Sequence, residues 1–124
     1  MSMWIDVPER VQTACVWEVC ARKLGNVHPG AAFGGTSLTD FLLSALAINL
    51  PFADDCGRGI GLAVWSAVEA TQEMVGQNTN LGICLAVAPL VAVRRTFPLT
   101  RDTVSDVLHR LTQDDAECVY KAIR

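Results

Sequence analysis

Hydrophobic positions recur with helical spacing in most segments of the chain. Near the N-terminus, Val7, Val11, Ala14 and Cys15 are separated by three, four or seven positions, which places their side chains on one face of an α-helix. Few stretches alternate apolar and polar residues with the period of two expected of a half-buried strand. The pattern therefore predicts an all-α fold, a bundle of five or six helices.

Capping and helix-breaking residues divide this pattern into elements. Pro8 is a favoured first helical residue, and Ser37 followed three positions later by Asp40 is a variant of the capping box. Gly76 ends one long apolar segment, and Pro89 is expected to kink the next because it lacks a backbone donor. The helices expected from these signals are about 8–22, 37–49, 58–75, 81–95, 100–111 and 112–124.

Glycine and proline mark the breaks in the N-terminal part of the chain. A glycine-rich loop from Leu24 to Thr36 connects the first and second expected helices. Pro51 and the small polar cluster 54–57 are expected to break the second helix. The last helix reaches Arg124 without a stop signal. We therefore expect one helical domain over residues 1–124 that is cut within a longer architecture.

Composition narrows the class of protein. The 124 residues are 51% hydrophobic and 19% charged, with a net charge of −3, so the chain is expected to fold as one compact domain and not to be disordered. The sequence contains no basic stripe, so nothing in its charge pattern indicates nucleic-acid binding. The longest weakly polar run, 81–93, is too short to span a membrane, and no signal peptide is recognisable. The five cysteines are expected to be reduced thiols, which predicts a cytoplasmic protein.

A carboxylate on the apolar face of the first helix is the first candidate for chemistry. Glu18 follows Val11 by seven positions and Cys15 by three, so it shares their face. A carboxylate there is costly unless it is paired, hydrogen-bonded or bound to a metal. Alternatively, Glu18 is solvated at the edge of that face, or pairs with Arg22 one turn later.

The glycine-rich loop that follows the first helix is a second candidate. Its first residues, Arg22-Lys-Leu-Gly-Asn-Val-His-Pro-Gly30, combine two cations, an imidazole and glycine backbone that can approach phosphate oxygens closely. A solvated glycine loop is the alternative. The residues expected to bind phosphate here are Lys23, Gly25, Asn26 and His28.

Two further segments carry polar residues at helix starts. Asp40 is explained by capping alone, or it is a second carboxylate that helps Glu18 to hold Mg²⁺ together with phosphate oxygens. The turn 76–82 leads into an apolar helix whose N-terminal amides could bind an anion, and Asn78, Thr79 and Asn80 also suit an ordinary N-cap. No Walker A or G-x-G-x-x-G motif is present.

Taken in order, these segments resemble the triphosphoribosyl-dephospho-CoA synthase family. The matching motifs are Glu18, the loop Lys23–Gly30, Ser37-Leu-Thr-Asp40-Phe and the turn Gly76-Gln-Asn-Thr-Asn-Leu-Gly82. The resemblance covers nearly the whole chain. Leu24 departs from the family pattern, which usually has proline there. Proteins of the family are typically about twice as long, so the resemblance implies that residues 1–124 are the N-terminal half of a longer family fold.

The resemblance implies an all-helical transferase that moves the triphosphoribosyl group of ATP onto a hydroxyl of dephospho-CoA and releases adenine. It implies ATP and dephospho-CoA as substrates and Mg²⁺ as the metal. Glu18 and Asp40 would be metal ligands, or one of them would be the catalytic base. Lys23, Gly25, Asn26 and His28 would bind phosphates, and Asn78, Thr79 and Asn80 would hold phosphate or ribose hydroxyls.

Two other functions remain open. One is a related ribosyl-type transferase with a different hydroxyl acceptor, such as an intermediate of pterin-type cofactor synthesis. The other is a truncated, non-catalytic helical module that dimerises. Because the last helix carries an apolar stripe that needs cover, we expect a homo-oligomer in either case.

Overall fold

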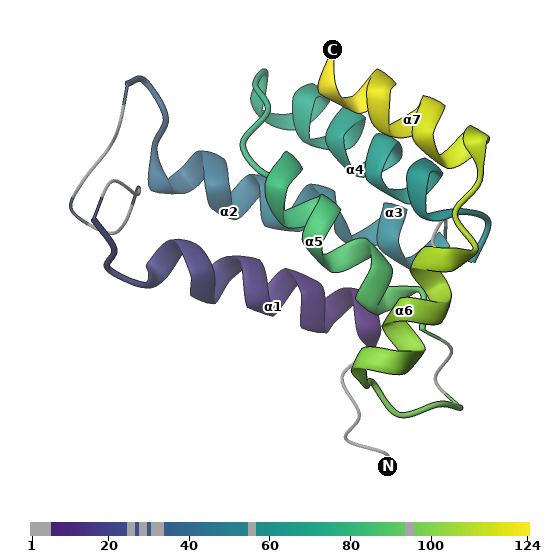
Figure 1. Ribbon diagram of the computed structural model, residues 1–124. Coiled ribbons are helices and arrows are strands. Elements are labelled where there is room, and N and C mark those ends of the chain that lie inside the picture. The colour runs from purple at the N-terminus through teal and green to yellow at the C-terminus, as the bar shows by residue number, and fades with distance from the viewer. Residues whose placement is uncertain (1–5, 25–26, 28–29, 31–33, 55–56, 94–95) are drawn as a thin grey trace.

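The computed structural model describes residues 6–24, 27, 30, 34–54, 57–93 and 96–124, and these residues form a helical bundle (Figure 1). No β-strand occurs within these ranges, so the predicted all-α fold is confirmed. The helices are α1 (Val7–Cys20), α2 (Leu38–Ala47), α3 (Asn49–Asp54), α4 (Ile60–Val75), α5 (Leu81–Val91), α6 (Arg101–His109) and α7 (Gln113–Ile123).

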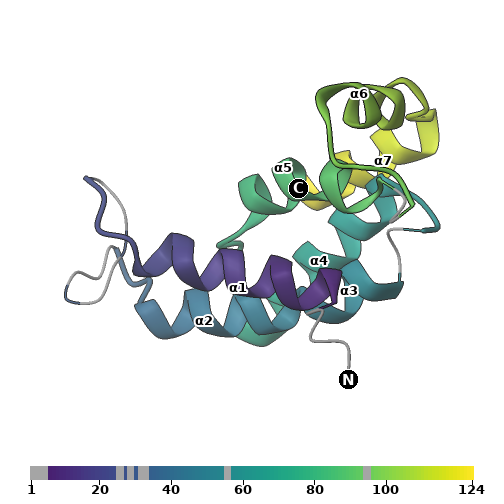
Figure 2. The same ribbon diagram turned by 90° about the horizontal axis from the view of Figure 1, so that it is seen from below.

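Helices α1 and α2 run side by side in opposite directions (Figures 1 and 2). α1 begins as predicted, with Asp6 as the N-cap, Pro8 in the first turn and Glu9 completing the capping box. Its buried residues are Val11, Cys15 and Val19, spaced so that one face meets α2 and the core. Because the two helices are antiparallel, the end of α1 and the start of α2 lie at the same end of the bundle.

The second expected helix is divided in two. α2 ends at Ala47, and the short helix α3 begins at Asn49, with Pro51 as its third residue. The expectation that Pro51 ends the helix was therefore wrong in detail. Proline is tolerated in a first helical turn, where the missing backbone N–H would have had no intrahelical partner. The break lies upstream of Pro51, and a new helix accommodates it.

Helix α4 is the centre of the molecule. It contacts α2, α3, α5 and α7, and its residues Ala63, Val64, Ala67 and Val68 are buried. The two alanines among these four residues allow the neighbouring helices to approach closely. α4 ends at Val75, as predicted, because Gly76 adopts a left-handed conformation with φ of 73° and closes the helix.

A single carboxylate joins the starts of α4 and α7. One oxygen of Asp115, Oδ1, accepts the backbone N–H of Gly61 at 2.8 Å, and the other, Oδ2, accepts the N–H of Thr112 at 2.9 Å and its hydroxyl at 3.0 Å. Partial burial raises the pKa of Asp115, but these hydrogen bonds outweigh burial and hold it below its usual value. A negative charge here also meets the positive ends of two helix dipoles.

Helix α5 is apolar on almost all sides and shorter than expected. It stops at Val91 instead of reaching Arg95, two residues after Pro89, which offers no backbone donor to the carbonyl of Leu85 four positions before it. Leu90, Leu99, Val104 and Leu108 line an open groove of about 480 Å³ between α5 and α6, together with Thr100, Arg101 and Ser105. None of the described helices is both long and apolar enough to cross a membrane.

Candidate functional site

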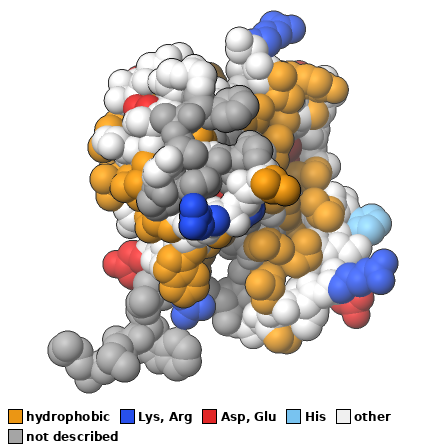
Figure 3. Space-filling view, turned by 90° about the vertical axis from the view of Figure 1, so that its left-hand side faces the viewer, with side chains coloured by type: hydrophobic (Ala, Val, Ile, Leu, Met, Phe, Trp, Pro, Cys, Tyr) orange, Lys and Arg blue, Asp and Glu red, His pale blue; other side chains and the backbone are white. Residues whose placement is uncertain are grey.

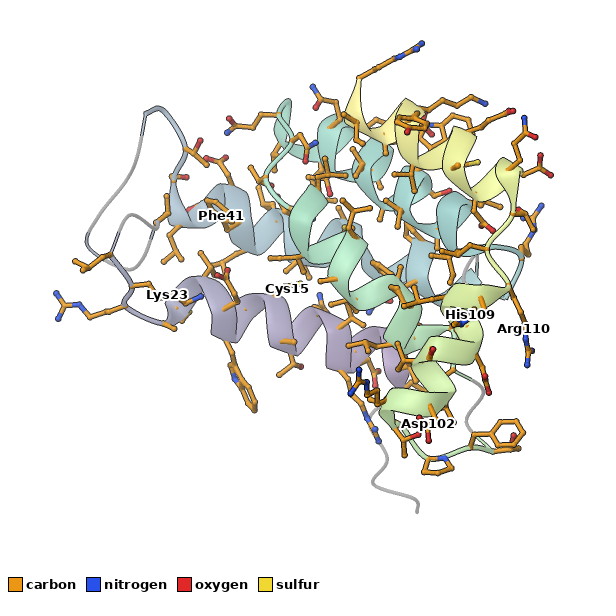
Figure 4. All side chains as sticks on the ribbon, viewed as in Figure 1. Cys15, Lys23, Phe41, Asp102, His109 and Arg110 are labelled. Carbon is orange, nitrogen blue, oxygen red and sulfur yellow. The ribbon has the colours of Figure 1, made fainter. Side chains whose placement is uncertain are left out.

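The candidate site lies at the end of the bundle where α1 finishes and α2 begins. Lys23 and Phe41 both lie at this end in Figure 4. The α4–α5 turn packs against α2 and the residues before it: the Thr36 hydroxyl donates to Oε1 of Gln77 at 3.3 Å, and the hydroxyls of Ser44 and Thr79 are 2.5 Å apart. α2 also packs against α1, so it contacts two segments that are distant from each other in sequence.

Glu18 is paired with Lys23, the cation that follows α1. Nζ of Lys23 lies 2.5 Å from Oε1 of Glu18, and the two side chains are 45% and 36% exposed, respectively. The sequence had offered Arg22 as a partner for Glu18, and the structure pairs Glu18 with the next residue, Lys23. Glu18 also lies close to Cys15, whose thiol pKa is raised to about 11, first by burial and then by the charge of Glu18.

Asp40 caps α2 as the sequence predicted. Its Oδ2 accepts the backbone N–H of Ser37 at 2.7 Å and the Ser37 hydroxyl at 2.9 Å. The backbone hydrogen bond, followed by the side-chain one, holds the pKa of Asp40 below its usual value. Asp40 is therefore an anion throughout the physiological pH range. A carboxylate with a lowered pKa is a poor proton acceptor and a good cation ligand.

Two carboxylates on neighbouring helices are the candidate metal ligands. Mg²⁺ takes oxygen ligands and usually needs only one or two carboxylates when substrate phosphates supply the rest. Glu18 and Asp40 are half-buried and belong to α1 and α2, which pack against each other. Within the described ranges, no group of three or more His, Cys, Asp and Glu side chains is arranged to hold a metal without such a substrate.

The three polar residues of the α4–α5 turn have different environments. Asn78 is exposed, and its Oδ1 accepts the backbone N–H of Leu81 at 3.1 Å. Thr79 is half-buried against Ser44. Asn80 is only 4% exposed. The prediction of an ordinary N-cap therefore fits Asn78, whereas Asn80 makes no side-chain cap to α5.

Two residues of this site were missed from the sequence. Thr71 of α4 and Ser44 of α2 are almost completely buried, and both bind the Asn80 amide: its Nδ2 donates to Oγ1 of Thr71 at 3.0 Å and to the carbonyl of Ser44 at 3.4 Å. The available signal was a hydroxyl residue within each otherwise apolar helical face. Gly25, Asn26 and His28, expected to bind phosphate, lie outside the described residues.

Comparison with protein-family models identifies the chain. The model of ATP:dephospho-CoA triphosphoribosyl transferase, CitG, matches residues 6–124. No curated protein and no solved structure matched the chain. The family match includes every candidate site residue, from Glu18 at the end of α1 to Asn80 at the start of α5. The chain therefore belongs to the CitG family of ATP:dephospho-CoA triphosphoribosyl transferases.

Proposed function

We propose that the end of the bundle around the start of α2 is the ATP-binding part of the transferase site. The family match over residues 6–124 supports transfer of the triphosphoribosyl group from ATP to dephospho-CoA. The observation that carries the proposal is that α2 packs against both α1 and the α4–α5 turn, since those segments contain the motifs of the family.

The reaction exchanges one bond at the anomeric carbon of ATP ribose for another. The bond from C1′ to adenine breaks, a bond from C1′ to a hydroxyl oxygen of dephospho-CoA forms, and the hydroxyl proton is lost. The site must therefore neutralise the triphosphate, tolerate positive charge at the ribose and accept that proton. Adenine leaves with the electron pair of the broken bond and takes up a proton.

Lys23 is the cation that we assign to the triphosphate. Its side chain is 45% exposed, and its ammonium group pairs with Glu18 at the start of the glycine-rich loop. A triphosphate carries several negative charges, so it competes effectively with a single exposed carboxylate for this ammonium group. When ATP binds the Lys23 ammonium group, the ion pair of Lys23 with Glu18 is broken, and Glu18 would then act as a metal ligand or as the base.

The two carboxylates then take different roles. Asp40 keeps its negative charge through its hydrogen bonds from Ser37, which suits a Mg²⁺ ligand and not a proton acceptor. Glu18 is the better candidate to receive the proton of the attacking hydroxyl or to complete the metal site. Mg²⁺ would supply charge neutralisation of the triphosphate. The turn residues Asn78, Thr79 and Asn80 would face the ribose or the phosphates.

Adenine release measures this function directly. We expect the purified chain, with ATP, Mg²⁺ and dephospho-CoA, to release adenine, and Glu18→Gln or Asp40→Asn to lower the rate at least 100-fold. Both substitutions remove the charge and keep an oxygen acceptor, so the Ser37 cap of α2 survives in Asp40→Asn.

Matched controls distinguish the effect of losing a negative charge at the site from the effect of losing one elsewhere. Glu69→Gln on α4 and Asp102→Asn on α6 neutralise exposed carboxylates outside the site, and each should keep the full rate. Rates that fall equally in control and site variants, or in none of them, would contradict the assignment of Glu18 and Asp40.

A further inference from the structure

We propose that Ser44 of α2 is a positioning residue of the transferase, which orients the hydroxyl of Thr79 in the α4–α5 turn for ATP binding. The inference rests on the proposed function, because it takes this turn as part of the nucleotide site. It goes further by giving a role to a serine that lies outside the motifs shared with the family. Ser44 is only 1% exposed, so it acts through Thr79 and does not itself contact the substrate.

Two hydroxyls in sequence connect the α4–α5 turn with α2. Oγ of Ser44 lies 2.5 Å from the carbonyl oxygen of Asp40, one helical turn earlier, and 2.5 Å from Oγ1 of Thr79. Ser44 is fully buried, and Thr79 is half-buried. Water cannot replace these partners at Ser44, so a buried hydroxyl of this kind depends on the bonds that it makes within the protein.

The carbonyl of Asp40 determines which hydroxyl donates to which. A carbonyl oxygen can only accept, and two acceptors 2.5 Å apart would repel each other, so the proton of Ser44 lies in the bond to Asp40. The oxygen of Ser44 then accepts, and the proton that it accepts comes from Thr79. The direction of the Thr79 hydroxyl is therefore set by Ser44, a residue of another helix.

Other hydrogen bonds attach the turn to α2 and the residues before it. The Thr36 hydroxyl donates to Oε1 of Gln77 at 3.3 Å. Nδ2 of Asn80 donates to the backbone carbonyl of Ser44 at 3.4 Å, and a substitution of the Ser44 side chain leaves that carbonyl in place. Loss of the Ser44 hydroxyl should therefore disturb the Thr79 side chain and leave the course of the turn unchanged.

The two candidate carboxylates are held by residues other than Ser44. The carboxylate of Asp40 accepts from Ser37, and Glu18 pairs with Lys23. Ser44 meets the backbone carbonyl of Asp40, not its carboxylate. We therefore expect Ser44 to influence the affinity for ATP more than the rate of the chemical step.

Steady-state kinetics of adenine release test this role. In Ser44→Ala we expect the KM for ATP to rise about tenfold, the effect of one hydrogen bond, and kcat to fall less than about threefold. A merely structural role would have a different signature, because a smaller folded fraction lowers kcat at an unchanged KM. Calorimetry with ATP and Mg²⁺ should show the same loss of affinity.

Variants of Thr79 cover the case in which Ser44→Ala does not fold. Thr79→Val keeps the shape of the side chain and removes its hydroxyl, so it should weaken ATP binding at least as much as Ser44→Ala. Thr79→Ser returns the hydroxyl and should recover most of the affinity that Thr79→Val loses. Because Ser44 acts through Thr79, the variant with both Ser44→Ala and Thr79→Val should bind ATP no more weakly than Thr79→Val alone.

Thr13→Ala is the matched control for the loss of a helical hydroxyl. The hydroxyl of Thr13 donates to the carbonyl of Glu9, four positions earlier in α1, at 2.8 Å. This bond is of the same local kind as the bond from Ser44 to Asp40. Thr13→Ala should therefore keep the ATP affinity of the unmodified chain.

The outcomes distinguish this inference from the proposed function. An unchanged KM and ATP affinity in Ser44→Ala, or losses that add in the double variant, would overturn the role of Ser44 and leave ATP binding intact. An equal loss of affinity in Thr13→Ala would also overturn it. A chain that binds no ATP would overturn the proposed function as well.

Discussion

The ion pair between Glu18 and Lys23 illustrates how exposure decides the role of a residue. Both side chains are substantially solvated, and exposed ion pairs typically contribute between about 0 and 1 kcal/mol to stability. Such a pair does little for the fold. Its position at the start of the glycine-rich loop instead favours a role in binding an anionic substrate.

Replacing Lys23 should therefore separate stability from binding. We expect Lys23→Met to change the free energy of unfolding by less than about 1 kcal/mol and to weaken ATP binding at least tenfold, because one cation on the triphosphate is lost. Lys121→Met is the control: Lys121 lies over the Trp65 ring at 4.7 Å on α7 and should not affect ATP affinity. Equal losses of affinity in both variants would contradict the role given to Lys23.

At single residues, the sequence predicted local chemistry better than tertiary contacts. The Ser37–Asp40 capping box depends on four neighbouring residues, so its spacing was sufficient to find it. The environment of Asn80 depends on Thr71 and Ser44, which come from two other helices. No local pattern places those three side chains together, so the buried polar cluster emerged only from the structure.

The helices themselves were mostly predictable because their signals are local. α4, α6 and α7 begin within two residues of the expected starts, and Gly76 closes α4 as expected. The prediction was less accurate for α2, α3 and α5. In these segments a proline can either end a helix or lie within the first turn of a new one, and the local pattern does not decide between the two.

The contact between α4 and α7 leaves no space for a side chain at Gly61. A Cβ added there would lie 2.3 Å from the backbone oxygen of Asp115, and backbone atoms cannot move aside as a flexible side chain can. Glycine is normally unfavourable within a helix by about 1 kcal/mol relative to alanine. Its presence is explained by the close approach of the Asp115 backbone, which leaves no room for a Cβ.

Gly61→Ala should consequently destabilise the protein despite its better helix propensity. We expect a loss of about 2–3 kcal/mol in the free energy of unfolding, from separation of α4 and α7. Gly82→Ala is the matched control, since its added Cβ meets no described atom within 4 Å, and it should be neutral or stabilising by up to about 1 kcal/mol. Chemical denaturation of both variants provides the comparison; equal stabilities would refute the close contact.

At the scale of the whole molecule, much apolar surface is exposed. Leu90, Leu99 and Leu108 are 43%, 61% and 45% exposed around the groove between α5 and α6. Figure 3, a view onto the end of the bundle, shows hydrophobic side chains gathered in a band with charged groups at its edges. Contiguous apolar surface of this kind is typical of protein–protein contact, and the expectation of a homo-oligomer stays a prediction.

Measuring the mass in solution tests that expectation. We expect light scattering to give a mass above 13.4 kDa for the chain, rising with concentration, and Leu108→Glu to shift it towards the monomer. A charge placed in an apolar interface is costly to bury. Leu46→Glu changes an equally exposed leucine of α2 and is the control. A monomer at every concentration, or equal effects of the two substitutions, would contradict an interface at this groove.

The helices could largely be predicted from the sequence, whereas the arrangement of the site could not. The motifs around Glu18, Asp40 and Asn78 could be found individually. Their meeting at one end depends on the antiparallel packing of α1 with α2 and on the α4–α5 turn against α2. The hydrogen bonds of the turn with Thr36 and Ser44 join residues 35 or more positions apart, and no periodicity in the sequence fixes them.

The most direct test of transferase function is the stoichiometry of one reaction. The chain would be incubated with ATP and Mg²⁺, with and without dephospho-CoA, and free adenine and the mass of the acceptor would be followed together. Our account predicts that adenine appears only with dephospho-CoA, in equal amount to an acceptor heavier by one triphosphoribosyl group. Bound ATP that stays intact with dephospho-CoA present, or adenine released without a heavier acceptor, would contradict it.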